Sequence, residues 1–161
     1  MGGPPSAGVT IIEFLDFQCP FCQESAAYLS EIRRRYPKEV SVIYRHFPAH
    51  QLAMPAAIAS LCANEQGAFE AMHDLLFAQM DSIGEKTWTR FATEAGVPDT
   101  VRFGACLDEP RMRELVVQDT LAARQLGVHG TPSFLINDLL LAGFHGAKEM
   151  DRLLERAIGF H

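Results

Sequence analysis

Apolar residues follow a strand pattern at the start of the chain and a helix pattern directly after it. Residues 9–15 (VTIIEFL) form a short run of β-branched and aromatic side chains, which predicts a strand buried on both faces. From Phe21 the apolar residues recur at helical spacing until Pro37 ends the pattern. Residues 40–44 (VSVIY) predict a second strand. This β-α-β opening requires a parallel strand pair joined by a right-handed crossover.

The middle of the chain, residues 52–126, has helical periodicity and no strand-like stretch. Its apolar stripes predict four helices, over residues 54–62, 69–80, 88–95 and 112–126. Gly96 and Gly127 follow the third and fourth of these, where helices commonly end. We find no internal repeat and no low-complexity linker.

Strand character returns at residues 133–136 (SFLI). Asn137-Asp138 separates this run from a second one at 139–141, which predicts a hairpin because Asn and Asp tolerate positive φ. A last helix keeps one apolar face over residues 150–158. The order β-α-β, helical block, β-β-α predicts an α/β protein with a central mixed sheet flanked by helices and one helical insertion.

Composition narrows the class of protein. With 48% hydrophobic and 21% charged residues among 161, the chain is neither disordered nor collagen-like, and it can bury one core. Fourteen basic against twenty acidic residues give a net charge of −6, which argues against nucleic acid as a partner. Residues 1–5 lack the basic and apolar regions of a secretory signal. We therefore expect either a cytoplasmic protein or a domain trimmed from an exported or anchored precursor.

Cys19-Pro20-Phe21-Cys22 carries the most chemical information. Two cysteines three residues apart at the start of a helix can close a small disulfide ring. Cys19 would lie at or just before the first turn, where unpaired N–H groups favour a thiolate and lower its pKa. Cys22, one turn further along, would be shielded and would act as the resolving thiol.

Zinc binding is the alternative interpretation, because Cys-x2-Cys is also a zinc-ligand spacing. A closed zinc site needs a second ligand pair. Cys62 and Cys106 stand alone in the sequence, and His46 and His50 are the only histidines at short spacing. A strand before the motif and a helix starting inside it favour a redox pair. We therefore expect no metal and no other cofactor.

Two segments, residues 13–22 (EFLDFQCPFC) and 127–134 (GVHGTPSF), resemble the DsbA-like branch of the thioredoxin superfamily. Residues 44–48 (YRHFP) and 72–77 (MHDLLF) are similar to that family too. The resemblance covers almost the whole chain and implies a thioredoxin fold interrupted by a helical subdomain. It implies one domain over residues 1–161, with the thioredoxin fold at 9–50 and 128–161 and the insertion at 52–126. The implied activity is thiol–disulfide exchange with proteins.

The sequence departs from the family pattern at two points. The edge strand that usually precedes Val9 is absent or truncated. Pro20-Phe21 stands where the best-known oxidases carry Pro-His, and phenylalanine cannot stabilise a thiolate by hydrogen bonding or charge. We therefore expect a weaker oxidant than the strongest family members.

The resemblance gives roles to residues outside the cysteine motif. Pro132 would be preceded by a cis peptide bond beside the motif, and the backbone of Thr131 would be free to pair with an extended substrate. Glu13 would be a buried acid below Cys22 with a raised pKa, able to relay that thiol's proton; the alternative is a solvated carboxylate. His129 would lie near the sulfurs or else be a solvated loop residue.

The remaining candidates concern the surface and the other cysteines. Pro20 and Phe21, with the helical block, would form a shallow apolar surface for unfolded chains. Cys62 and Cys106 would be either free buried thiols or a structural disulfide, and the resemblance favours the disulfide and thus an oxidising compartment. The other histidines show no convergent pattern, so packing or surface positions are expected for His46, His50, His73 and His145.

These observations predict a periplasmic or otherwise extracytoplasmic thiol:disulfide oxidoreductase that donates the Cys19–Cys22 disulfide to folding proteins. The resemblance implies a membrane quinone-linked reoxidant similar to DsbB or to vitamin K epoxide reductase. One alternative is a reductase or isomerase, although nothing in the chain resembles the dimerisation module that an isomerase usually needs. Another is a redox-sensing or regulatory domain, cut from a larger membrane protein, that binds a partner without turnover.

Overall fold

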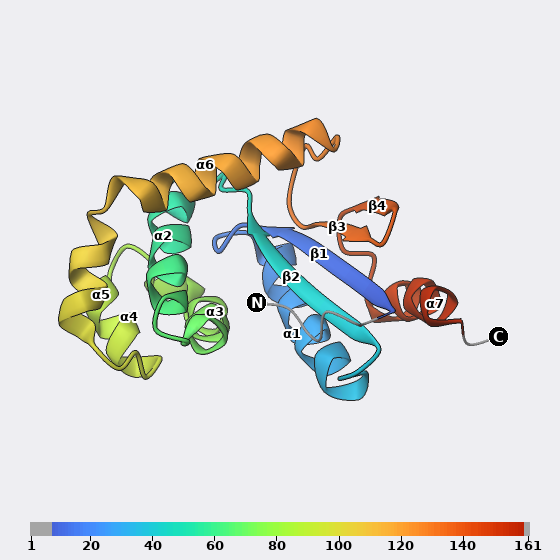
Figure 1. Cartoon of the computed structure of the whole chain (residues 1–161), viewed down its shortest axis with the longest axis horizontal. Coiled ribbons are helices and arrows are strands. Elements are labelled where there is room, and N and C mark those ends of the chain that lie inside the picture. Colours follow the sequence, from blue (N-terminus) through green and yellow to red (C-terminus); the bar gives the residue numbers. More distant parts are fainter. Residues whose placement is uncertain (1–7, 160–161) are drawn as a thin grey trace.

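The computed structural model describes residues 8–159 and contains one mixed sheet with the strand order β2-β1-β3-β4 (Figure 1). β1 (Val9–Leu15) runs parallel to β2 (Val40–His46). β3 (Ser133–Ile136) runs antiparallel to β1 and to β4 (Leu139–Ala142). The mixed sheet, the parallel β1–β2 pair and the hairpin confirm the predicted fold class. The predictions for residues 1–5 and for a strand before Val9 lie outside the described residues.

Helices pack on both faces of the sheet, because side chains of β1 alternate between them. Ile11 and Leu15 point into the main core, which they share with α1 (Pro20–Arg35) and α7 (Ala147–Ile158). Phe14 points to the opposite face, where it forms a smaller cluster with Phe47, Val128 and Ala123 of α6 (Pro110–Gln125). The run of β-branched and aromatic residues that predicts a strand buried on both faces therefore places side chains in both clusters, and only Thr10 and Ile12 are half-buried.

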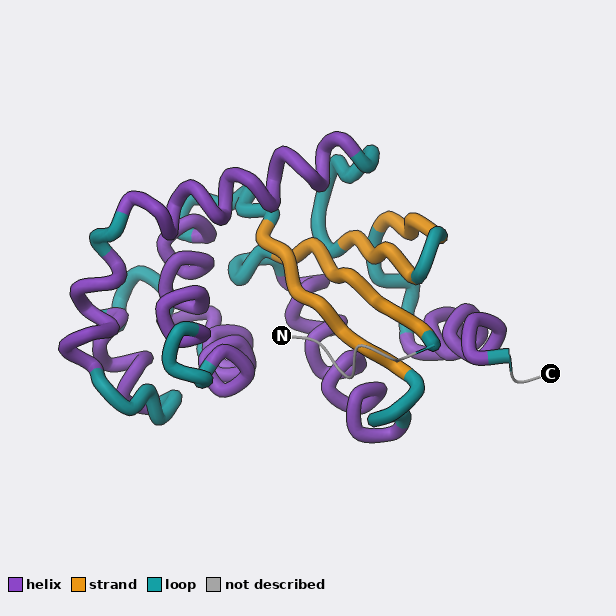
Figure 2. The backbone as a smooth tube through the Cα atoms, viewed as in Figure 1, coloured by secondary structure: helices purple, strands orange, loops and turns teal. Residues whose placement is uncertain are grey.

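The helical insertion begins with four helices that Figure 1 shows beside the sheet and Figure 2 shows free of strands. They are α2 (Ala53–Asn64), α3 (Phe69–Ala78), α4 (Trp88–Glu94) and α5 (Thr100–Leu107). A single 3-10 turn, Met80–Ser82, follows α3. The apolar pattern did not separate α5, which is short and contains Gly104; its start is marked by Asp99, whose carboxylate accepts the N–H of Arg102.

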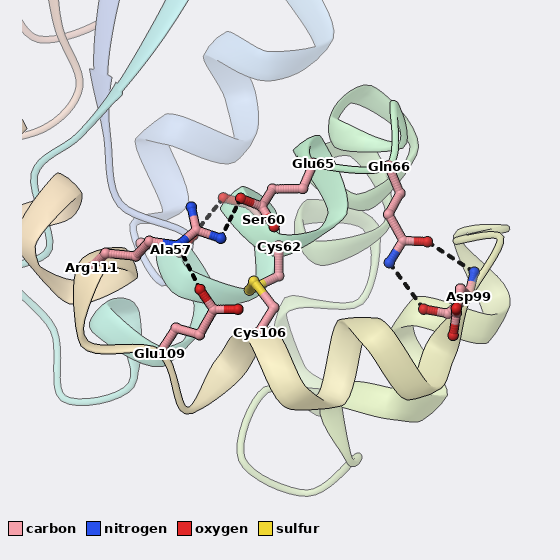
Figure 3. The surroundings of a disulfide bond; sticks show 9 residues. All are labelled: Ala57, Ser60, Cys62, Glu65, Gln66, Asp99, Cys106, Glu109 and Arg111. Atoms are coloured by element: carbon pink, nitrogen blue, oxygen red, sulfur yellow. Dashed lines mark hydrogen bonds and ion pairs between the residues drawn. A yellow bond between two sulfur atoms is a disulfide. The ribbon is translucent and has the colours of Figure 1, made fainter.

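A disulfide between Cys62 and Cys106 joins α2 to α5, so of the two alternatives for these cysteines the structure has the bridge (Figure 3). Polar contacts flank it on both sides. Arg111 pairs with Glu65 at 2.6 Å, and a reciprocal pair of hydrogen bonds joins the side chain of Gln66 to the backbone of Asp99. The bridge and these contacts fasten α5 and the start of α6 to α2.

Helix α6 contacts both the helical group and the sheet. Its first half, with Met112 in the main core, follows α5, whereas Ala123 near its end packs on Phe14. The division of the chain at residue 126 thus stays a prediction, because one continuous helix serves both groups. Within residues 8–159, no helix is long and apolar enough to cross a membrane.

Candidate active site

The cysteine motif lies between the end of β1 and the first turn of α1. Cys19 is the N-cap residue of α1 and Pro20 is its first residue, as the motif predicted. The backbone N–H of Cys19 donates to the carbonyl of Asp16 at 3.0 Å, which holds the turn closed. No side chain caps this helix, so its first N–H groups are left to the Cys19 sulfur. Both cysteines are free thiols here; Cys22 is fully buried and Cys19 is 5% exposed.

The two sulfurs have very different acidities. The pKa of Cys19 is lowered to about 5, first by a hydrogen bond from the Cys22 thiol and then by the side chain of Thr131 and the N–H groups of Cys22 and Phe21, while burial opposes the shift. The pKa of Cys22 is raised, because its thiol proton is held by Cys19, because it is buried, and because Glu13 is near. At neutral pH this pair therefore carries one thiolate, on Cys19, and one thiol, on Cys22.

Glu13 lies on β1 and is completely buried. Its Oε1 accepts a hydrogen bond from the hydroxyl of Ser25 at 2.6 Å, and its Oε2 has no partner among the described residues. Burial raises its pKa to about 8, against the hydrogen bond from Ser25, which lowers it. Glu13 is thus a buried acid close to Cys22 rather than a solvated carboxylate; its role as a proton relay stays a prediction.

The loop before β3 lies against the first cysteine. The peptide bond between Thr131 and Pro132 is cis, and the sulfur of Cys19 lies 3.4 Å from the carbonyl oxygen of Thr131. Pairing of the Thr131 backbone with an extended substrate stays a prediction. The carbonyl of Pro132 accepts the N–H of Gly143 at 2.8 Å, which ties the loop to the end of β4.

A shallow hollow of about 210 Å³ opens along this loop, and His129, Thr131 and Pro132 are among the residues that line it. His129 itself is exposed. Phe21, next to Cys22, is 59% exposed, and Pro20 is exposed as well. Of the residues predicted to contact substrate, Pro20, Phe21 and His129 are thus exposed and Thr131 is half-buried, and their part in binding stays a prediction.

Sequence analysis missed the polar residues that hold the motif in place. The buried carboxylate of Asp16 accepts hydrogen bonds from the loop that follows β2. Gln18 accepts the N–H of Leu52 at 2.7 Å, and the amide of Gln23 donates to the carbonyl of Phe77 at 2.6 Å. The sequence feature that indicates these contacts is Asp16 itself, a carboxylate directly after an apolar strand and three residues before Cys19.

The histidines fall into three environments. His46 and His73 are buried and both pack against Phe17, as expected for packing residues. His145 is exposed. His50 is half exposed but its ring contacts the buried Asp16, so it is neither a core residue nor a free surface residue. No group of three or more metal-binding side chains comes together within residues 8–159.

Comparison with known proteins supports this description. The family model described as Thioredoxin matches residues 1–156. The crystal structure of a thioredoxin-like oxidoreductase from Silicibacter pomeroyi DSS-3 is 31% identical, with a TM-score of 0.81 over 96% of this chain and 89% of that one. The structure of alpha-DsbA1 from Wolbachia pipientis is 23% identical, with a TM-score of 0.84 over 98% of this chain and 89% of that one.

Curated relatives extend beyond this chain. A Na(+)/H(+) antiporter NhaA from Herminiimonas arsenicoxydans is 31% identical over 153 residues, which are 95% of this chain and 24% of the antiporter. NhaA 3 from Salinispora tropica is 38% identical over 138 residues, 84% of this chain and 21% of that protein. The chain spans about a quarter of the length of the curated relatives it matches. With the matched family model and the shared architecture, the chain belongs to the thioredoxin family of oxidoreductases and has the fold of the DsbA proteins.

Proposed function

We propose that this domain oxidises protein thiols by donating a Cys19–Cys22 disulfide. A substrate thiolate attacks the sulfur of Cys19, forms a mixed disulfide and releases Cys22, which takes up a proton and becomes a thiol. A second substrate thiolate then attacks the substrate sulfur of the mixed disulfide and releases Cys19 as a thiolate. The substrate is oxidised by two electrons and the cysteine pair is reduced. Cys22 can also attack the mixed disulfide and free a substrate that cannot complete the reaction.

The acidity of Cys19 is the observation that carries this proposal. With a pKa of about 5, the thiolate is the stable form at pH 7, two pKa units above the midpoint. At pH 7, relative to a thiol with a pKa of 7, this stabilises the reduced pair by about 2.3 kcal/mol. For a two-electron couple that free energy corresponds to about 50 mV of oxidising power. A stable reduced form is what makes the disulfide a good oxidant.

The surroundings of Cys19 suit a polypeptide substrate. Phe21 is an exposed apolar side chain one residue before the buried Cys22, and the hollow along Thr131 and Pro132 offers room for an extended segment. We infer that Pro20, Phe21 and this hollow bind unfolded chains with little sequence preference, and that His129 lies at the rim of the bound segment. Because Phe21 brings no charge to the thiolate, the domain is a weaker oxidant than a relative with histidine there.

Glu13 takes part in the protonation of the buried Cys22. A carboxyl group with a pKa of about 8 is largely protonated at pH 7, so it can exchange a proton with Cys22 without placing two negative charges in the core. Its Oε2, which has no partner among the described residues, is the atom left for that exchange. We infer that Glu13 supplies or receives the proton of Cys22 as the disulfide opens and closes.

The setting of the domain follows from its cysteines and relatives. A structural disulfide such as Cys62–Cys106 persists in an oxidising compartment, so we place the domain outside the cytoplasm. A membrane quinone-linked protein similar to DsbB or vitamin K epoxide reductase would reoxidise it. Because it spans a quarter of relatives named as antiporters, we propose that it works as part of a larger membrane protein.

The equilibrium of Cys19–Cys22 with glutathione tests the direction of electron flow. We expect a potential well above about −250 mV, and oxidation of a reduced, unfolded protein by the disulfide form. A potential below about −250 mV, together with rapid reduction of insulin, would instead identify a reductase.

A second candidate is a redox-sensing domain without turnover, and the antiporter relatives favour it. In that case the cysteine pair would equilibrate with glutathione but would neither oxidise an unfolded protein nor reduce insulin. Multiple turnovers with a reduced protein substrate and a chemical reoxidant would exclude this candidate.

A further inference from the structure

When a substrate reduces the Cys19–Cys22 disulfide, one proton released by the substrate thiols is not taken up by the cysteine pair. Two substrate thiols lose two protons when they become a disulfide. Cys22 takes one of them and becomes a thiol, whereas Cys19 is released as a thiolate at neutral pH and takes none. The second proton must go to solvent or to a group near Cys19. Glu13 already holds a proton at pH 7. A second titratable group among the described residues is held by Asp16 of the same turn, the imidazole of His50.

The carboxylate of Asp16 fixes the position of this imidazole. Asp16 Oδ2 receives the Nδ1 of His50 at 2.8 Å and the backbone N–H groups of Ala49 at 2.7 Å and of His50 at 3.0 Å. Its Oδ1 receives the N–H of Gln18 at 2.7 Å. An ionised carboxylate only accepts hydrogen bonds, so Nδ1 carries the hydrogen and Nε2 is the atom that can gain or lose a proton. The Asp16 side chain is fully buried, while that of His50 is 50% exposed.

The same contacts tie His50 to Cys19. The carbonyl of Asp16 accepts the N–H of Cys19, so one residue holds the N-cap with its backbone and the imidazole with its side chain. Gln18 adds a second link between the motif and the segment of His50, because its side chain accepts the N–H of Leu52. Asp16 therefore joins the imidazole to the residue that caps α1, and half of the His50 side chain is exposed to solvent.

We propose that His50, oriented by Asp16, accepts a proton when the Cys19–Cys22 disulfide is reduced and gives it up when the disulfide forms again. This inference rests on the proposed function and adds a group to it. On reduction, the proton leaves a substrate thiol and bonds to Nε2 of His50, and the resulting cation lies within electrostatic reach of the new thiolate. On reoxidation the charge of Cys19 disappears, and the proton returns to solvent.

The electrostatics agree with this geometry. Asp16 raises the pKa of His50 through its hydrogen bond and its charge, burial opposes this weakly, and the charge of Cys19 raises it further. Asp16, from the end of β1, and Cys19, from the start of α1, are the charged groups that act on the ring. Only the second of them changes with redox state. The midpoint of His50 should therefore be higher in the reduced protein than in the oxidised one.

Titration of the histidine ring protons by NMR in both redox states tests the proposal. Reduction with dithiothreitol needs no protein substrate, so the result does not depend on whether the domain oxidises proteins. We expect the His50 midpoint to rise by several tenths of a pH unit on reduction, and that of the exposed His145 to stay constant. Equal His50 midpoints in the two states would overturn the proposal.

Two variants sharpen the assignment. His50→Gln removes the titrating resonance and identifies it. In Cys19→Ser the reduced protein has no thiolate at the site, so its His50 midpoint should fall to that of the oxidised protein. If the midpoint of Cys19→Ser instead equals that of the reduced protein, the charge of Cys19 does not act on His50 and the proposal fails. Failure to oxidise a protein substrate would remove the proposed function but leave this measurement decisive.

Discussion

The acidity of Cys19 depends mainly on one donor, the thiol of Cys22. That contact outweighs the N–H groups at the start of α1, which sequence analysis had taken as the main cause. The Cys-x2-Cys motif shows that two cysteines are close in the fold. It does not show which hydrogen bond lowers the pKa of Cys19 most, because that depends on how the two sulfurs are buried and oriented.

The first prediction concerns this donor. Cys22→Ala removes the thiol that stabilises the Cys19 thiolate, so the midpoint of Cys19, followed by the ultraviolet absorbance of the thiolate, should rise from about 5 towards 9. Cys22→Ser keeps a donor at the same place and should give a smaller rise. A midpoint unchanged in Cys22→Ala would mean that the helix terminus alone sets the acidity.

Glu13 gives a prediction about stability. The folded protein keeps the Glu13 proton up to about pH 8, whereas the unfolded chain releases it above about 4.5, so stability falls as pH rises between these values. Glu13→Gln is neutral throughout and its amide oxygen can still accept from Ser25. In the oxidised form we expect the variant to gain about 2–3 kcal/mol in free energy of unfolding at pH 7 and nothing at pH 4.

Urea unfolding at the two pH values measures this difference. Glu114→Gln, on the exposed face of α6, is the matched control and should change neither value. If Glu13→Gln and the parent protein lose stability in parallel between pH 4 and pH 7, Glu13 is ionised in the fold and cannot exchange a proton with Cys22.

At the scale of elements, local signals predicted most of the fold. Asn137 adopts φ 51° in the turn between β3 and β4, which is the positive φ that the Asn-Asp pair predicted for a hairpin. Its side chain also accepts the N–H of Thr10 at 2.9 Å. The strand β1 was predicted with its observed bounds. Elements without a long apolar stripe were harder: α5 has eight residues, and only its N-cap Asp99 marks it.

The links between elements could not be predicted. Asp16, Gln18 and Gln23 each bond to a segment more than thirty residues away, and no local pattern encodes such a partner. The pairing of Cys62 with Cys106 came from family resemblance and not from spacing. Tertiary contacts of single polar side chains are set by packing, which sequence periodicity does not describe.

The disulfide between α2 and α5 supports a prediction at this scale. It closes a loop with a sequence separation of 44 residues. Chain entropy alone assigns such a loop about 4 kcal/mol, and we expect Cys62→Ala/Cys106→Ala to lose about 2–4 kcal/mol in free energy of unfolding. Each single variant already lacks the bridge, so it should lose nearly as much as the double variant.

The redox pair provides the counterpart measurement. The bridge lies within the helical group, whereas Cys19 and Cys22 lie at the start of α1, after the inner strand β1, so the equilibrium of Cys19–Cys22 with glutathione should not change in the double variant. A large change in that equilibrium would show that α2 and α5 shape the active site.

At the scale of the whole molecule, the active site is formed where several separate parts of the chain meet. Cys19 and Cys22 lie at the start of α1, the loop of Pro132 comes from the last part of the chain, and Gln18 and Gln23 bond to the helical insertion. A substrate on the Pro132 loop and a contact on the helices would both act on the same cysteine pair.

Trapping of the mixed disulfide tests the central claim most directly. The Cys22→Ala variant, activated as a Cys19 mixed disulfide with glutathione, is mixed with a reduced, unfolded protein. We predict transfer of Cys19 to a substrate cysteine, giving a covalent complex that dithiothreitol releases and that Cys19→Ala never forms. If the complex does not form, or forms equally through another cysteine, Cys19 is not the sulfur that exchanges with proteins and the account is wrong.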